Sequence, residues 1–426
     1  MVVEGTKWGA LCCKLASNRS AENDMSYFSM NEKRNSSRRR FIKELFCGSA
    51  TAACIGGLPM LGCRRNNMST IEFLTIPDPD GWHPSLRLKG DWLIIKISDG
   101  VLAGYGEASH CKQDKVCRDV AAKLFAERIA DFRLSFEKLK ELEQELMGTK
   151  PDFVTATAWS GINQALYDLL AKREQVPVWQ LFAQKPGLEK LPLYTTINRA
   201  LRDRDHADYL QVVGEVQSQG FKTFKCAPFE KVTNKETAIE DSRDGLETLQ
   251  LLRDRFPDLA MRVDFHERYH LEEFLQVVPD LETVGLNWIE EPFEMGDDYL
   301  ELKENISIRL AAGELFWGRT RFQKIMENEW ADIIMPDVKH VGGFGPLLDV
   351  LEMGKGRIEI SPHNPSGPIS SAASIHAAAL YPDVVNSLEF SFDRELTRRK
   401  YGEQVEDGNL FLSDKPGWGI DPESIL

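Results

Sequence analysis

The sequence has no surplus of basic residues. In 426 residues, 66 Asp and Glu face 52 Lys and Arg, which gives a formal net charge of -14. Binding to a phosphate backbone depends on clustered Lys and Arg, so nucleic acid is not an expected partner. The chain also lacks an internal apolar run of about 18 residues, the least that a membrane-spanning helix needs. We therefore expect a body that neither binds nucleic acid nor crosses a membrane.

Cysteine is scarce in the body of the chain. Five of the eight cysteines fall within the first 67 residues, and only Cys111, Cys117 and Cys226 remain beyond them. No two cysteines are spaced as Cys-x-x-Cys, so neither a disulfide framework nor a cysteine zinc site is expected. The length accommodates a barrel of about 250 residues and a second, smaller domain.

The first 67 residues differ in composition from the rest. Residues 37–43 have the sequence SRRRFIK and lie directly before a weakly apolar stretch of small residues at 44–62. Paired arginines at this place are typical of a twin-arginine export signal. The alternative is the basic start of a solvated helix, but Gly56, Gly57 and Pro59 make the stretch a poor helix. We predict an export leader over residues 1–67 and a periplasmic protein, which would be cytoplasmic if the leader does not function.

The end of the leader leaves two alternatives open. MLGC at 60–63 resembles a lipoprotein processing box, although Met60 is a weak match to its first position. In one interpretation Cys63 carries a lipid anchor, which would be the only contact with a membrane. In the other, the protein is periplasmic without an anchor. Residues 1–24 have no place in such a signal, and Met25 or Met30 would start it at an ordinary length.

Residues 68–191 are predicted to form an α+β domain. Residues 92–97 alternate apolar and polar side chains, turn at SDG (98–100) and continue in a second run at 101–107, as in an antiparallel hairpin. Helical spacing follows at 115–147 and 153–172. The pattern then changes.

Eight short apolar segments alternate with amphipathic segments over residues 192–395. Strands separated by helices indicate right-handed parallel crossovers, and eight of them fit a closed barrel better than an open sheet. The tail, 396–426, contains a short apolar strand and the turn PGWG at 416–419, and we expect it to return to the first domain. The eight predicted strands are 193–198, 223–229, 260–266, 286–293, 309–315, 332–339, 357–362 and 386–392.

An acidic or basic side chain stands at the end of each of these strands from the third onward. Their separations of 26, 24, 23, 26 and 26 residues are close to one strand-and-helix unit. Side chains at strand ends in such a barrel converge at one end, where the active site lies. A single carboxylate is most often a solvated surface group, but six ionisable groups inside apolar runs are costly to bury without a function. The six are Asp264, Glu290, Glu314, Asp337, His363 and Glu389.

Two chemical roles follow from these residue types. Asp264, Glu290 and Glu314 on consecutive strands offer three hard oxygen ligands, which predicts Mg2+. Such an ion can hold a substrate carboxylate and the second negative charge that develops when the α-proton leaves. Asp337 and His363 lie on neighbouring strands, so the carboxylate can orient the imidazole and raise its basicity. We predict His363 as a general base.

These motifs resemble the enolase superfamily, in its mandelate racemase subgroup, over about residues 68–426. The resemblance implies an α/β fold, a (β/α)7β TIM-like barrel with an N-terminal α+β capping domain completed by the C-terminal tail. It also implies Mg2+ on the three carboxylates and a homo-oligomer. It rests on WIEEP at 288–292, AAGE at 311–314, MPDVKHVGG at 335–343 and SPHNPSGP at 361–368.

Two further residues gain a role from the resemblance. VDFH at 263–266 looks like the galactonate dehydratases, in which the histidine two residues after the metal-binding aspartate is the general acid. In a strand, alternation would put His266 on the same face as Asp264. The alternative is a hydrogen-bonded core histidine. Glu389 matches the family's acidic hydrogen-bond donor to the substrate carboxylate.

One motif departs from the family pattern. Racemases of this subgroup carry Lys-x-Lys at the end of the second strand, whereas this chain has Lys225, Cys226 and Ala227. Alanine stands where the opposing base should be, which puts two-base racemisation in doubt. Lys225 could bind the substrate carboxylate, or it could be a structural cation at the barrel mouth.

The leading hypothesis is dehydration of a polyhydroxy sugar acid to a 2-keto-3-deoxy acid through a metal-stabilised enolate. An epimerase or cycloisomerase using the same enolate is the alternative enzyme, and a sugar-acid-binding protein without turnover is the alternative outside catalysis. The Asp337 and His363 pair speaks against the binding protein, because binding alone needs no base. The identity of the sugar acid depends on first-domain loops at 77–86 and 109–115.

Overall fold

The computed structural model describes residues 70–76, 82–83, 88–89, 91–110, 113–394 and 397–424. The predicted leader, including Cys63, lies outside these residues, as do Cys111 and most of the loop at 77–86. The described residues all belong to one compact unit, Arg65–Leu426. None of the helices in these ranges is both long and apolar enough to span a bilayer.

A three-stranded antiparallel sheet opens the first domain. Its strands β1 (Thr70–Ile76), β4 (Trp92–Ser98) and β5 (Ala103–Glu107) pair in the order β1-β4-β5. The expected hairpin is therefore confirmed as β4 and β5. A separate pair, β2 (Trp82–His83) and β3 (Leu88–Lys89), lies between β1 and β4 in the sequence.

Helices pack on this sheet. The expected helical stretch at 115–147 is in fact interrupted. The helix α2 (Asp114–Leu124) continues into a π-helical turn at Phe125–Ile129, which ends the first part. Ser135 then caps the next helix with its side chain. That helix is α3 (Phe136–Gly148), and α4 (Phe153–Glu174) follows. Gly104 and Gly106 let β5 approach α4 closely, since a Cβ atom there would lie about 2 Å from backbone oxygens of α4. The 3-10 turn Val178–Leu181 ends the domain.

All eight expected barrel strands are present, and all but the first are shorter than predicted. Each pairs in parallel with its neighbour from β6 to β12, and β13 pairs in parallel with β6. The last gap is bridged by a parallel bridge between Ile360 and Val385 and by the Glu389 N–H, which donates to the Pro362 carbonyl at 3.2 Å. The barrel therefore closes. The strands are β6 (Lys190–Thr196), β7 (Thr223–Cys226), β8 (Ala260–Asp264), β9 (Trp288–Glu290), β10 (Arg309–Ala312), β11 (Ile333–Ile334), β12 (Glu359–Ile360) and β13 (Leu388–Ser391).

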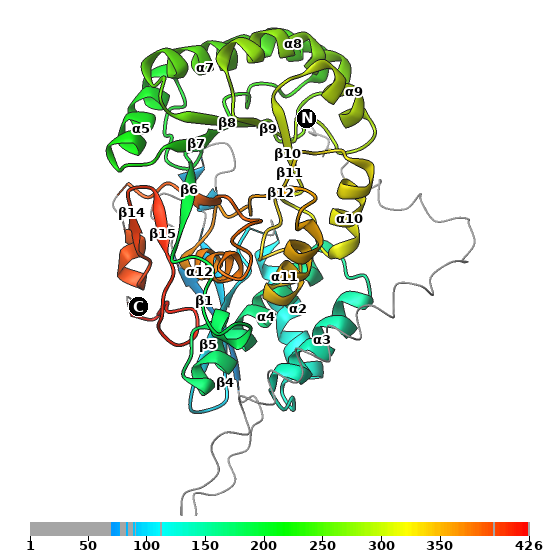
Figure 1. Cartoon of the computed structure of the whole chain (residues 1–426), viewed down its shortest axis with the longest axis vertical. Helices are drawn as coiled ribbons and strands as arrows, with labels where there is room; N and C mark the ends of the chain where they lie inside the picture. Colours follow the sequence, from blue (N-terminus) through cyan, green and yellow to red (C-terminus); the bar gives the residue numbers. More distant parts are fainter. Residues whose placement is uncertain are drawn as a thin grey trace, which may run out of the picture. The chain divides into compact units, whose positions relative to one another are not determined.

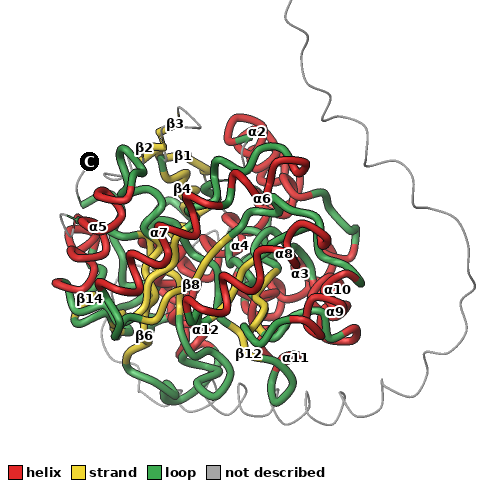
Figure 2. Tube along the Cα trace, turned by 90° about the horizontal axis from the view of Figure 1, so that it is seen from above, coloured by secondary structure: helices red, strands yellow, loops and turns green. Residues whose placement is uncertain are grey.

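Helices connect successive strands and cover the outside of the barrel. In Figure 1, α5, α7, α8 and α9 run along its outer rim, whereas α11 and α12 lie beside elements of the first domain. Seen from above, the helices surround strands such as β6, β8 and β12 (Figure 2). Their bounds are α5 (His206–Ser218), α6 (Ala238–Asp241), α7 (Arg243–Arg255), α8 (Leu271–Val284), α9 (Asp298–Asn305), α10 (Arg319–Asn328), α11 (Phe344–Gly354) and α12 (Pro368–Ala378), with a 3-10 turn at Lys235–Thr237 before α6.

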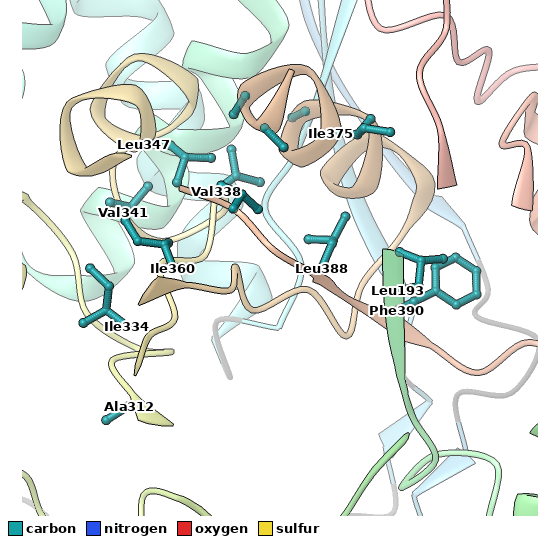
Figure 3. Close-up of a cluster of buried hydrophobic side chains, with 14 of the residues drawn as sticks. Leu193, Ala312, Ile334, Val338, Val341, Leu347, Ile360, Ile375, Leu388 and Phe390 are labelled. Carbon is teal, nitrogen blue, oxygen red and sulfur yellow. The ribbon is translucent and has the colours of Figure 1, made fainter. Parts of the chain in front are cut away.

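Apolar side chains fill both faces of the barrel wall. On the outer face, Ile360 and Leu388 from the strands face Leu347 of α11 and Ile375 of α12 (Figure 3). Inside, a separate buried cluster contains Tyr194 and Trp288, and the Arg262 guanidinium stacks over both rings. The interior is packed, so chemistry is restricted to the ends of the barrel.

The C-terminal tail returns to the first domain as expected. After the 3-10 turn Thr397–Tyr401, β14 (Val405–Glu406) and β15 (Asn409–Phe411) form a hairpin, and β15 pairs antiparallel with β6. Trp418 then donates its backbone N–H to Asp168 of α4 at 2.8 Å and its indole N–H to the Tyr105 carbonyl of β5 at 2.9 Å. The tail thus completes the capping domain. The domain boundaries at 191 and 395 stay predictions, and the first of them falls within β6.

Candidate active site

Three carboxylates meet at the carboxyl end of the barrel strands. Asp264 ends β8, Glu290 ends β9, and Glu314 follows β10 after Gly313, whose φ of +102° turns the chain. These three residues, called the carboxylate triad below, offer ligand oxygens that all lie within 4.8 Å of one another. Asp264 and Glu290 are buried, and Glu314 is half-buried. The neighbouring parallel strands bring them together, as the sequence predicts.

The close approach of three carboxylates is unfavourable without a cation. Burial and the neighbouring Asp264 carboxylate raise the pKa of Glu290 well above its usual range. Three carboxylates this close together, two of them buried, repel one another unless positive charge lies between them. The donor set consists only of carboxylate oxygens, the type that Mg2+ prefers. The residues present therefore fit a Mg2+ ion.

Lys225, from β7, lies beside the triad. Its ammonium group donates to both Glu290 oxygens at 2.8 and 2.9 Å, and it lies 3.5 Å from Asp264 Oδ2 and 3.1 Å from Glu389 Oε1. Burial opposes its charge, but these carboxylates outweigh burial and raise the pKa of Lys225 well above its usual range. Ala227, the residue after β7, is buried and offers no second base here.

His363 and Asp337 form a hydrogen-bonded pair. His363 Nδ1 lies 2.7 Å from Asp337 Oδ2, and its Nε2 lies 3.1 Å from Glu314 Oε2. Burial lowers the pKa of His363, but the carboxylates of Glu314 and Glu389 and the hydrogen bond to Asp337 outweigh it and raise that pKa to about 10. Because Asp337 holds one ring nitrogen, the other is oriented toward the triad.

Two residues near Asp337, Lys339 and His340, have no predicted role. The Lys339 backbone N–H donates to Asp337 Oδ1 at 2.8 Å, and its buried ammonium forms an ion pair with Oδ2. His340 Nε2 lies 4.0 Å from the same oxygen, and its Nδ1 lies 2.9 Å from Thr157 of α4. Burial opposes ionisation of Asp337, but Lys339, His340 and His363 hold its pKa far below the usual range. The Asp-x-Lys spacing in MPDVKHVGG was the available signal.

His266 lies beside the triad, but not for the reason expected. The predicted strand to residue 266 is wrong, because β8 ends at Asp264 and His266 lies in a turn at φ +50°. The turn forms because the His266 N–H donates to Asp264 Oδ1 at 3.0 Å. Its Nε2 then lies 3.0 Å from Asp264 Oδ2, with 39% of the side chain exposed. Desolvation opposes protonation, but attraction to Asp264 prevails and raises the pKa of His266.

Glu389, from β13, lies between Lys225 and His363. Its Oε1 faces Lys225, and its Oε2 lies 3.7 Å from His363 Nε2 and accepts the Asn364 N–H at 3.2 Å. The structure therefore brings all eight predicted site residues together.

Two more residues support this site without having been predicted. Glu291 accepts the Gly313 N–H at 2.8 Å and so holds the turn before Glu314. Burial and the Glu314 carboxylate raise the pKa of Glu291 to about 8. From the first domain, His110 Nδ1 lies 3.2 Å from the Ser366 hydroxyl, so the start of the expected loop lies against the loop that follows His363. The expected loop is shorter than predicted, because α2 begins at Asp114.

Known proteins share this sequence pattern and this fold. The family described as enolase C-terminal domain-like matches residues 208–425, more than half of the chain. The N-terminal domain of mandelate racemase and muconate lactonizing enzyme matches residues 87–183. A D-galactonate dehydratase of Klebsiella pneumoniae (strain 342) is 27% identical over 358 residues, covering 79% of this chain and 90% of that protein.

Solved structures show the same architecture. A mandelate racemase/muconate lactonizing enzyme-like protein from Roseovarius sp. TM1035 superposes with a TM-score of 0.73 at 20% identity, over 84% of this chain and 94% of that one. The 3,6-anhydro-D-galactonate cycloisomerase from Zobellia galactanivorans gives a TM-score of 0.68 at 22% identity, over 84% and 97% of the two chains. With matches to both domains, the chain belongs to the enolase superfamily, within the mandelate racemase and muconate lactonizing enzyme family.

Proposed function

We propose that this protein is a Mg2+-dependent hydro-lyase that dehydrates a polyhydroxy sugar acid to a 2-keto-3-deoxy acid. The observation that carries the proposal is the placement of two imidazoles at different carboxylates of one triad, His363 at Glu314 and His266 at Asp264. One imidazole can remove a proton while the other supplies one. The relatedness to a D-galactonate dehydratase supports the same reaction class.

The triad would hold Mg2+, which when bound supplies positive charge beside the substrate carboxylate and its developing second charge. Lys225, which already lies among the carboxylates, would bind the same end of the substrate, and Glu389 would hold Lys225 in place. These contacts orient the α-carbon toward the His363 ring.

The two histidines would then divide the proton transfers. His363 Nε2 takes the α-proton, and the electron pair of that C–H bond moves into the substrate carboxyl group to give an enolate. The same pair then forms the double bond between the α-carbon and C3 as the C3–O bond breaks. His266 gives a proton to the departing hydroxyl, which leaves as water. The enol product tautomerises to the 2-keto-3-deoxy acid. The Asp337 carboxylate keeps the His363 ring oriented throughout, and Lys339 keeps Asp337 ionised.

Two alternatives remain distinguishable from this proposal. An epimerase or cycloisomerase would use the same α-proton abstraction, but Ala227 removes the family's opposing base. The cycloisomerase of Zobellia galactanivorans shares the fold at 22% identity. At this identity, a shared fold does not indicate a shared reaction. A binding protein without turnover would have no use for the buried Asp337 and His363 pair.

The test is a screen of sugar acids, including D-galactonate, with and without Mg2+, for formation of a 2-keto-3-deoxy acid. We expect at least one substrate to lose water, and none to do so without the metal. Release of an epimer or a lactone in place of a keto acid would favour the alternative enzymes. If no sugar acid is converted, the binding protein without turnover is the alternative that remains.

Export through the leader is a separate proposal, supported by SRRRFIK at 37–43 before the apolar stretch. Replacement of Arg38 and Arg39 by Lys is expected to retain the protein in the cytoplasm, because the pair is the feature that the twin-arginine route recognises. Fractionation of the cells measures this. Arg40→Lys, outside the pair, serves as the matched control and should still be exported. An unaltered protein that is already cytoplasmic and unprocessed would contradict the proposal, including the lipid anchor at Cys63.

A further inference from the structure

A buried carboxylate of the first domain contacts the helix that follows the proposed base. Glu107 ends β5 and is fully buried. Its Oε1 accepts the Gly367 N–H at 2.8 Å, and its Oε2 accepts the Ser370 N–H at 3.0 Å. The Ser109 hydroxyl donates to Oε1 as well, at 2.8 Å. Residues more than 250 positions apart in the sequence are thus joined at the first turn of α12.

Glu107 is the cap of α12, although it belongs to another domain. The helix begins after Gly367, which has no side chain to accept a backbone N–H. Helix N-termini need such an acceptor, and a carboxylate adds a favourable interaction with the positive end of the helix dipole. Glu107 is itself fixed, because its backbone N–H and carbonyl both bond to the side chain of Gln164 in α4.

Only four residues, 364–367, separate His363 from α12. They form no regular secondary structure. Arg398 donates to the Ser366 carbonyl at 2.6 Å, and Asn364 donates its side-chain amide to Ser371 of α12 at 2.9 Å. The link is also held by Glu389, which accepts the Asn364 N–H, so α12 is one of three elements that fix its position.

Close packing transmits the position of Glu107 into this link. A Cβ atom on Gly367 would lie 2.9 Å from Glu107 Oε2 and 2.8 Å from Trp92 of β4. Such a contact leaves no room for Gly367 to move toward the first domain. A displaced Glu107 would therefore displace the link and the His363 ring with it.

We propose that Glu107 is a positioning residue for His363: the capping domain fixes the start of α12, and through it the orientation of the base at the barrel mouth. The proposal rests on the proposed function only in calling His363 the base. No contact in the described residues joins Glu107 to the carboxylate triad or Lys225, so its effect on the reaction passes through the link that follows His363.

The experiment compares Glu107→Gln with a matched control in the full chain. Asp168→Asn is the control, because Asp168 is also a fully buried carboxylate of the first domain and accepts the N–H groups of Tyr105 and Trp418 at 2.9 and 2.8 Å. It holds the tail, Tyr105 of β5 and the Lys172 ammonium rather than the link after His363. Both variants replace a carboxylate by an amide that can accept only part of the original hydrogen bonds.

The first readout needs no substrate. The proton between His363 Nδ1 and Asp337 is observed by NMR of the Mg2+-loaded, 15N-histidine-labelled protein and assigned by its absence in His363→Asn. We expect Glu107→Gln to shift or lose this resonance and Asp168→Asn to retain it, even where both lower Tm. A purely structural role of Glu107 would lower Tm in both variants and leave the resonance unchanged.

The second readout is turnover of the sugar acid found by the screen. We expect kcat of Glu107→Gln to fall by about 10- to 100-fold, the usual range for losing a group that orients a reacting residue, with KM and Mg2+ affinity little changed. Parent-like kcat together with an unchanged resonance would overturn the proposal. If the parent acts on no sugar acid, the proposed function fails, but the resonance still decides the role of Glu107.

A second variant covers the case in which Glu107→Gln does not fold. Gly367→Ala leaves Glu107 in place and adds one methyl group against Glu107 and Trp92. Its backbone φ of -80° suits alanine, so strain is confined to this contact. We expect the same change in the His363 resonance. An unchanged resonance in Gly367→Ala would overturn the proposal on its own.

Discussion

Glu290→Gln is expected to abolish dehydration while the protein stays folded. Glu290 is central in the triad, since it pairs with Asp264 across β8 and β9 and holds both hydrogen bonds of Lys225. The amide keeps the shape but removes the charge that a divalent cation needs. A metal in such a site supplies several kcal/mol of stabilisation to the developing charge, which corresponds to about 10³-fold or more in rate. Turnover with excess Mg2+ measures the loss.

Thermal unfolding separates loss of metal binding from loss of the fold. A ligand that binds only the folded protein raises its stability by about 2.7 kcal/mol at one hundred times its Kd. Added Mg2+ should therefore raise Tm of the parent but not of Glu290→Gln. The variant itself should be as stable as the chelated parent, because the amide relieves repulsion with Asp264 and Lys225 keeps its ion pair with Glu389.

Glu359→Gln is the matched control for this prediction. Glu359 also lies on a barrel strand, but at the opposite end, where it pairs with Arg309 at 2.6 Å. It should keep parent activity and the Mg2+ response. Full activity after exhaustive chelation, or a parent-like Mg2+ response in Glu290→Gln, would contradict the assignment of the triad as the metal site.

Substitution of the two histidines is expected to separate proton removal from water loss. His363→Asn should lose both. Among the described side chains, His363 alone is oriented toward the triad by Asp337, so no other base would replace it. His266→Asn should lose dehydration by roughly 10²-fold or more, the usual scale for a general acid. It should still exchange the α-proton with deuterated solvent, provided that this proton faces His363. Proton NMR of the recovered substrate and an assay of the keto acid give the two rates.

The exposure of His266 allows an effect on catalysis to be distinguished from an effect on folding. With 39% of its side chain exposed, its replacement should barely change Tm, so a lost rate reports chemistry rather than folding. His206→Asn is the control and should match the parent in both rates, because His206 Nε2 lies 3.4 Å from Asp244 of α7 rather than at a triad carboxylate. Parent-rate dehydration by His266→Asn would remove it as the acid. Inversion of the α-carbon by the parent without loss of water would replace the dehydratase by the epimerase.

The regular part of the molecule follows from local pattern. Alternation of apolar strands and amphipathic helices predicts the barrel, and a recurring spacing of 23 to 26 residues places Asp264, Glu290, Glu314, Asp337 and His363 at one end of it. Each step needs only the knowledge that parallel strands point the same way. Strand ends were less predictable. At the carboxyl end of the barrel, polar side chains accept hydrogen bonds from the backbone of their own turns, as Asp264 does from the His266 N–H. The strands therefore end earlier than their hydrophobic residues suggest.

What the sequence alone determined is therefore the fold, the carboxylate triad and the His363 and Asp337 pair, because all of them depend on periodicity along the chain. Only the tertiary structure decided which more distant partners surround these groups: Glu291 beside the turn before Glu314, and Glu107 at the start of α12. Such contacts join positions up to 263 residues apart. Local periodicity tells which face of a strand or helix is buried, but not which distant polar group will meet it there, since that depends on how the two domains pack.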